Sequence, residues 1–398
     1  MLLLLLWFIV DPLWLGQGPF RVNRDPGPLK YLVILLGILV CVAATRESDA
    51  PGVRSTRGWQ SVSWRVLPLA SFAFYVFTGS LYARLALGIS ESFLQFGLAP
   101  VAFVVGFVVF ASVRQPERYL RFYILLLWAS LAYVIPVVVM RRLQHGQAFH
   151  TEIFLLAPLI MHALLFGRTF AIRWTGAAVI VVLIFLLHKN LGYLCMLICI
   201  AYWIVVDRAR RPSLHYRPVA KTTLQLLAAA IVLGIVLAAS LYLYDHRATL
   251  LPSGNTKVRT EIYGKVWDRF LGSPFIGDAF TGSVFTQLRS MRIFGTPNVT
   301  THSDWLDTLA HGGVFGLMLF LAGIFLPLIL AIRDIRRAPA GPLTDQLHIL
   351  LATIFCGLLV SGFVSLFNGL PLAFAFWLCL GSVSAGAHRL AHLSKSHV

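Results

Sequence analysis

Long apolar runs separated by short polar loops are the feature that most constrains this chain. Several runs reach the roughly 20 residues that an α-helix needs to cross the hydrocarbon core of a bilayer. Only 12% of the 398 residues are charged, whereas soluble domains carry about a quarter. The sequence therefore predicts an all-α polytopic membrane protein with about twelve transmembrane helices. These fall at about 2–19, 29–45, 66–87, 93–112, 122–140, 152–166, 174–187, 191–206, 222–244, 306–332, 346–367 and 371–387.

The positive charge of the chain follows the topology expected of such a protein. The formal net charge is +17, but most basic residues sit in short loops between apolar runs. This pattern is explained by orientation in the membrane and by anionic lipid, and it argues against a nucleic-acid partner. Alternate loops are rich in arginine, from Arg46 to Arg65 near the start and from Arg333 to Arg337 near the end. The positive-inside rule places these loops, and with them both termini, in the cytoplasm.

One segment on the opposite side is long enough to carry structure of its own. We expect residues 1–244 to hold helices one to nine, residues 245–305 to form a large outer loop, and residues 306–398 to hold the last three helices. Apolar residues recur every four positions from Val258 to Phe270, which predicts an amphipathic helix at the outer membrane surface. Gly272 and Pro274 end it, and a weaker apolar pattern over 284–291 predicts a second interfacial helix.

The outer loops should be poor in lysine and arginine, yet several of these residues lie there. A cluster of cations on the outer face favours an anionic substrate, although contact with lipid phosphates is the alternative. All five cysteines lie inside apolar runs, which indicates buried small side chains and no disulfide framework. The candidate anion-binding residues are Arg141, Arg142, Lys189, Lys257 and Arg259.

A polar stretch leads from the outer loop into the tenth apolar run and contains a candidate general base. Thr301 is a plausible N-cap, with Asp304 three residues later as in a capping box. His302 then lies in the first helical turn, where the helix dipole favours the neutral imidazole that a base needs. The alternative interpretation is that His302 only caps the helix at the membrane surface.

The residues from Arg259 to Gly316 resemble the signature region of the O-antigen ligase and polymerase superfamily. The likeness rests on an arginine, an aromatic-rich helix, a Pro–Gly turn, a histidine followed by an aromatic residue and leucine, and a glycine-rich helix start. These correspond to Arg259, Trp267, Pro274 with Gly277, His302 to Leu306, and Gly312 to Gly316.

The resemblance implies a metal-independent, cofactor-free inverting glycosyltransferase of the bacterial inner membrane, with its active site on the periplasmic face. The donor is a glycan on undecaprenyl pyrophosphate. The acceptor is another lipid-linked repeat unit in a polymerase and lipid A-core in a ligase. Membrane lipids and other polysaccharide-assembly proteins are the further partners that it suggests.

Two departures from the ligase pattern favour a polymerase. His188-Lys189-Asn190 stands where ligases carry a Ser-Arg-Gly-like turn, and Ser303 stands where ligases commonly carry asparagine. The absence of an Arg-x10-Gly pattern, proposed for some polymerases, points the other way, so a ligase remains the alternative. A transporter of lipid-linked glycans is a further alternative, but the charges lie at helix ends and not near mid-membrane.

With the resemblance, the site residues take definite roles as expectations. His302 is the catalytic base, and Asp304 either orients it or caps the helix. Arg259 stabilises the charge that develops on the leaving pyrophosphate. The pyrophosphate is bound by Arg259, Arg141, Arg142, Lys189 and Lys257.

Overall fold

The computed structural model describes residues 65–79, 99–112, 115–145, 153–187, 190–210, 254–277, 303–363, 366–367 and 370–396. Regular structure within these ranges is helical, as predicted. The predicted helices at 2–19, 29–45, 222–244 and 284–291 lie outside the described residues.

The described helices follow the remaining apolar runs in order. The helix Arg65–Gly79 comes first. After it come α4 (Val101–Ser112), α5 (Pro116–His145), α6 (Ile153–Leu156), α7 (Leu159–Phe166), α8 (Phe170–Leu187), α9 (Asn190–Arg210), α12 (Gly254–Gly272), α14 (Asp304–Arg337), α15 (Pro342–Phe363) and α16 (Leu370–Ser396).

By length and composition, α14 and α15 are the described helices able to cross a membrane unaided, and five shorter apolar helices accompany them. Two boundaries differ from prediction. The run at 152–166 is two helices, because Pro158 lacks an N–H and the backbone turns at Ala157 and Pro158. Helix α5 continues through Arg141 and Arg142 to His145, since no proline or glycine lies between Pro136 and Gly146.

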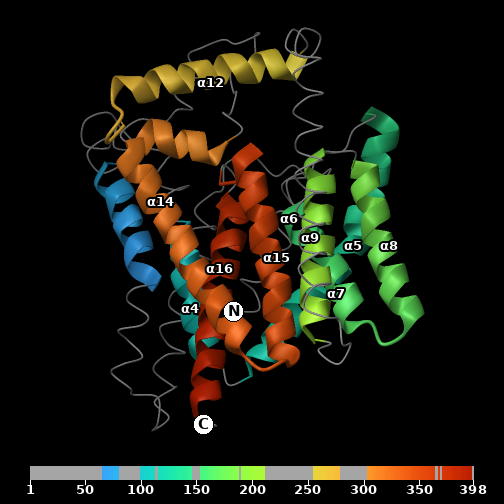
Figure 1. The fold of residues 1–398 in the computed structure, drawn as a ribbon. Coiled ribbons are helices and arrows are strands. Elements are labelled where there is room, and N and C mark those ends of the chain that lie inside the picture. Colours follow the sequence, from blue (N-terminus) through green and yellow to red (C-terminus); the bar gives the residue numbers. More distant parts are fainter. Residues whose placement is uncertain are drawn as a thin grey trace, which may run out of the picture.

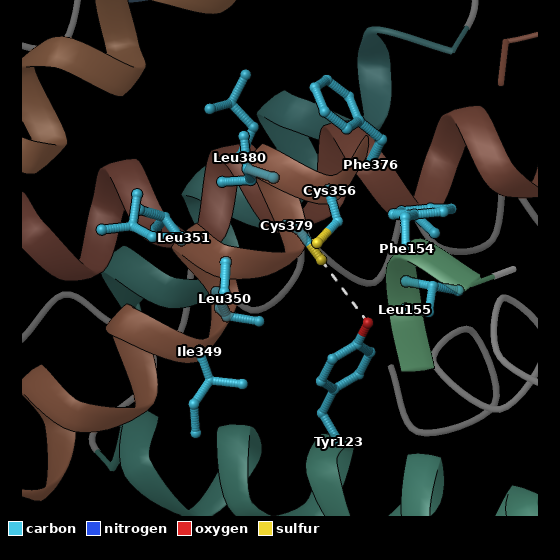
Figure 2. Close-up of a cluster of buried hydrophobic side chains, with 14 of the residues drawn as sticks. Tyr123, Phe154, Leu155, Ile349, Leu350, Leu351, Cys356, Phe376, Cys379 and Leu380 are labelled. Carbon is cyan, nitrogen blue, oxygen red and sulfur yellow. Dashed lines mark hydrogen bonds between the residues drawn. The ribbon is translucent and has the colours of Figure 1, made fainter. Parts of the chain in front are cut away.

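The bundle contains two groups of helices that share one apolar core (Figure 1). In the first group α4 runs along α16, and α14 and α15 pack beside α16. In the second group α7 packs against α8 and α9, and α9 reaches across to α15. Figure 2 shows part of this core, where the hydroxyl of Tyr123 on α5 lies 3.7 Å from the sulfur of Cys379 on α16.

A buried ion pair ties three helices together at one end of the bundle. The guanidinium of Arg65 donates to the carboxylate of Asp334 on α14, and to the carbonyl and hydroxyl oxygens of Ser384 on α16. Arg65 was predicted to be a loop residue, but it begins a helix and is buried. The contact brings together segments that the charge pattern assigns to one side of the membrane. The C-terminus lies at this end, and α12 lies across the other (Figure 1).

Candidate functional site

Helix α12 is the amphipathic helix that the sequence predicts in the large outer loop. It spans Gly254–Gly272 and ends in a turn over residues 273–277, in which the N–H of Gly277 donates to the carbonyl of Ser273 at 2.9 Å. Figure 1 shows α12 lying across the bundle, next to the beginning of α14. Lys257 and Arg259 lie in its first half.

The apolar face of α12, which we predicted to lie at the outer membrane surface, is partly covered by protein and partly exposed. Ile262 and Val266 are buried against Ala310 of α14, with Tyr263 and Leu306 beside them. Further along, the apolar side chains are not covered by protein, with exposed fractions of 50% at Trp267, 58% at Leu271, 77% at Phe275 and 54% at Ile276. The C-terminal end of α12 is therefore the part whose composition suits a lipid surface.

Helix α14 begins two residues later than predicted. Its N-cap is Ser303, whose hydroxyl oxygen accepts from the N–H of Leu306 at 3.4 Å. The predicted cap, Thr301, lies outside the described residues, as does His302. Asp304 and Asp307 occupy the first helical turn, where negative charge interacts favourably with the helix dipole.

Asp304 connects the start of α14 to the turn between α15 and α16. It is 1% exposed, and its Oδ2 atom accepts from the backbone N–H groups of Leu366 at 2.7 Å and Phe367 at 3.1 Å. The neighbouring Trp305 donates its indole N–H to the Ser361 hydroxyl on α15 at 2.9 Å. These bonds fix the first turn of α14 against α15 and the turn that follows it.

Helix α14 is broken at Gly313, and the 304–312 segment before the break runs in a different direction from the rest. Gly313 has φ 59° and ψ −164°, a conformation that is open essentially to glycine alone. The rings of Trp305 and Phe325 are 6.4 Å apart, although twenty residues of straight helix would separate them by about 30 Å. The segment therefore folds back across the end of the bundle, under α12.

The break is also where the turn after α12 joins α14. Since the helix restarts at this point, its first N–H groups need acceptors from outside. Val314 donates to the carbonyl of Pro274 at 2.8 Å, and Phe315 donates to that of Phe275 at 3.0 Å. A Cβ atom on Gly313 would overlap the Phe275 carbonyl. We call this contact, formed by residues 273–277 and 313–315, the glycine junction.

The opposite side of the glycine junction is equally close. Gly277 has φ 56°, and a Cβ atom there would lie 2.8 Å from the carbonyl oxygen of Ala310 and overlap that of His311. Tyr75, from the helix Arg65–Gly79, donates its hydroxyl to the Ile276 carbonyl at 2.6 Å and packs edge-on against Phe315. Three separate parts of the chain thus meet at the junction.

The structure places some of the predicted site residues at the contact between α12 and α14 and others on α5. Arg259 lies on α12 three residues before Ile262, and these two positions share a helix face. Asp304 lies in the segment that α12 covers. Arg141 and Arg142 are in the last turns of α5, which packs against α7, α8 and α15. Lys189, like His302, lies outside the described residues.

Sequence reasoning did not identify the functions of Gly313 and Gly277. The sequence indicated Gly313 only as part of a glycine-rich helix start, and Gly277 only as part of a turn. The signal was present in the Gly312–Gly313 pair inside an otherwise helical pattern, which marks a possible break. The buried His311, two residues before the break, was also passed over.

A comparison with protein families matches residues 175–321 to the model described as O-antigen ligase. The chain carries an O-antigen ligase family domain. The matched region starts in α8 and ends beyond the glycine junction, so it includes Lys189, Lys257, Arg259, His302 and Asp304. Arg141 and Arg142 precede it. No curated protein matches the chain.

The family described by this match has a general activity. Proteins of this family are membrane enzymes of the ligase and polymerase type, which transfer glycans that are linked to lipids. The match confirms the resemblance seen in the sequence over residues 175–321.

Proposed function

We propose that this protein is a glycosyltransferase of the polymerase type, which joins repeat units linked to undecaprenyl pyrophosphate at the periplasmic face. One observation carries the proposal. Helix α12, which holds Lys257 and Arg259, packs against the 304–312 segment, and the chain leads from that segment directly back to His302. Lys257 and Arg259 thus lie on the helix that covers the segment in which Asp304 lies, two residues after His302 in the sequence.

In the proposed reaction an acceptor hydroxyl attacks the anomeric carbon of the donor glycan. A new glycosidic C–O bond forms while the bond from the anomeric carbon to the phosphate oxygen breaks, and the pyrophosphate leaves with the electron pair. The hydroxyl proton passes to the imidazole of His302. A single displacement of this kind inverts the anomeric configuration.

Cations are needed because negative charge grows on the pyrophosphate as the bond breaks. Guanidinium groups suit this task, since their paired N–H donors match two phosphate oxygens at once. We assign Arg259 the central contact with the pyrophosphate and Lys257 a supporting one. Both lie on α12 just before Ile262, where α14 begins to cover the helix. We assign Lys189, Arg141 and Arg142 further contacts with the pyrophosphate, and the transfer proceeds without a metal ion.

The acceptor distinguishes the two reactions that the family comprises. A lipid-linked repeat unit is favoured by Lys189 and Ser303, which replace the arginine and asparagine of the ligase pattern. Lipid A-core is the second candidate, because the matching family model is described as O-antigen ligase. The site lies on the outer face of the bacterial inner membrane, with both termini in the cytoplasm and other polysaccharide-assembly proteins as neighbours.

Substitutions on α12 test the proposal in a transfer assay with purified protein, lipid-linked donor and EDTA. Arg259→Lys keeps the charge but removes the paired donors, and we expect transfer to fall about tenfold, with a larger loss in Arg259→Ala. The matched control is Arg269→Lys, ten residues further along the same helix, which we expect to retain activity within twofold. Equal activity of Arg259→Ala and the wild type contradicts the assignment, and loss of transfer in EDTA contradicts metal independence.

The acceptor is tested by deleting the gene in its host and separating lipopolysaccharide on a gel. A single repeat unit on the core supports the polymerase. Loss of all O-chain supports the ligase and contradicts our first choice.

A further inference from the structure

Three buried cysteines lie where the two groups of helices meet. Cys195 and Cys199 are one helical turn apart on α9, and Cys356 lies on α15, which packs against α9. All three side chains are fully buried, and Figure 2 shows Cys356 among other side chains of the core. The sulfur atoms of Cys199 and Cys356 are 3.6 Å apart, so the two helix groups touch through a pair of thiols.

The contacts of Cys356 distinguish its two neighbours on α9. Its thiol donates to the backbone carbonyl oxygen of Cys195 at 3.7 Å, and the side chain of Cys195 is also within hydrogen-bonding reach of it. A thiol carries one hydrogen, so with that hydrogen engaged by the carbonyl, the lone pairs of the Cys356 sulfur remain for its contact with Cys199. Cys199 is therefore the partner with which Cys356 can form a bond, and Cys195 is the natural control.

We propose that Cys199 and Cys356 form an oxidation site, at which a peroxide converts the two thiols into a disulfide that joins α9 to α15. The sulfur–sulfur bond of a disulfide is about 2.05 Å long, so the two atoms have to approach by about 1.5 Å. Rotation about the Cα–Cβ bonds can supply a movement of this size. The site does not depend on the proposed function, because neither residue takes part in transfer.

The surroundings of this thiol pair select the oxidant. Both sulfurs lie in the apolar core of the bundle, from which charged reagents such as glutathione disulfide are excluded by the cost of desolvation. Hydrogen peroxide and lipid hydroperoxides are uncharged at the reacting end, and they are small or soluble in the membrane. A peroxide is therefore the class of oxidant that suits the site.

The oxidation balances in two steps. One sulfur attacks a peroxide oxygen, so that an S–O bond forms, the O–O bond breaks, and the thiol proton leaves with the released oxygen as water or alcohol. The second sulfur attacks the resulting sulfenic acid, so that the S–S bond forms, the S–O bond breaks, and the second thiol proton leaves with the hydroxyl group as water. The two thiols lose two electrons, which reduce the peroxide.

Counting free thiols in the full chain tests the proposal. The protein is placed in nanodiscs that hold a single copy, treated with hydrogen peroxide or with buffer, unfolded in SDS and alkylated with iodoacetamide, and the labels are counted by mass. The chain has five cysteines, so we expect five labels without peroxide and three after it. The lost labels should return after dithiothreitol, as they do for a disulfide but not for a sulfinic acid.

Single alanine variants assign the disulfide to its partners. Cys199→Ala and Cys356→Ala should carry the same number of labels with and without peroxide, whereas the matched control Cys195→Ala should still lose two. Five labels in the peroxide-treated wild type overturn the proposal. A loss of two labels that persists in Cys199→Ala places the disulfide elsewhere and overturns it as well.

Thermal unfolding of the same samples gives a second measurement. The bridge would link residues 157 positions apart in the sequence, and closing so long a loop stabilises a fold. We expect the unfolding temperature of the wild type to rise by several degrees after peroxide and to return after dithiothreitol, with no rise in Cys199→Ala. An equal rise in Cys199→Ala, or none in the wild type, contradicts a bridge between the helix groups.

Discussion

Replacing Gly313 by alanine should open the glycine junction without unfolding the bundle. An alanine at φ 59° and ψ −164° costs about 1–3 kcal/mol in backbone strain. Its Cβ would also lie 2.6 Å from the backbone nitrogen of Gly277 and overlap the Phe275 carbonyl, so the turn must move away. The two hydrogen bonds from Val314 and Phe315 would then be lost, at about 1 kcal/mol each.

Together these terms amount to about 3–5 kcal/mol against the closed junction. This cost falls on the contact between α12 and α14, which is small because it buries few apolar side chains, among them Ile262 and Val266. The rest of the bundle is held by the packing of α4, α14 and α15 with α16. The junction should therefore open locally while the remaining helices stay packed.

Hydrogen exchange read by mass spectrometry checks this directly. The amides of Val314 and Phe315 should exchange at least about 10²-fold faster in Gly313→Ala, which corresponds to the lower end of that free energy. Transfer should fall about 10²-fold, since the 304–312 segment loses its fixed end. The matched control is Gly264→Ala on α12, where a Cβ atom would meet open space and activity should stay within twofold. Wild-type exchange and transfer in Gly313→Ala would refute the reasoning.

Two further predictions concern the ends of the bundle. Asp334→Ala should lower the free energy of unfolding by about 3–5 kcal/mol, because it leaves the buried Arg65 charge without its partner. Thermal unfolding in detergent measures this loss. The double variant Arg65→Met/Asp334→Leu should lose less stability, and an equal or larger loss would contradict the explanation. A polarity-sensitive dye attached at Leu271→Cys should report an apolar surrounding in lipid nanodiscs, because this exposed side chain lies at the apolar end of α12. The variant also carries Cys41→Ser, so that the dye is directed to the new cysteine. The same dye on the exposed Asp268→Cys should report water, and equal spectra at the two positions would contradict the prediction.

The elements predicted best were those whose signals are local. Helix α12 followed from a four-residue apolar repeat closed by Gly272 and Pro274, and it ends at Gly272. Helices α8 and α9 are longer than the apolar runs 174–187 and 191–206 that predicted them. The four described cysteines are buried and free, in agreement with their place in apolar runs.

The features that were missed depend on partners far away in sequence. Thr301 and Ser303 are both residues that cap helices, and only the bonds from Asp304 to Leu366 and Phe367 show which turn begins α14. The break at Gly313 requires the turn after α12, and the burial of Arg65 requires Asp334. Hydrophobic periodicity contains no information about such pairs.

The measurement that most directly tests the account is single-turnover transfer by the purified protein, comparing the wild type with His302→Ala at equal protein levels. We predict that the wild type alone converts the lipid-linked donor into longer glycan and undecaprenyl pyrophosphate, with inversion at the anomeric carbon. His302→Ala should lose about 10²–10⁴-fold in rate, the contribution of a well-placed base. Transfer by His302→Ala at the wild-type rate would contradict the central claim.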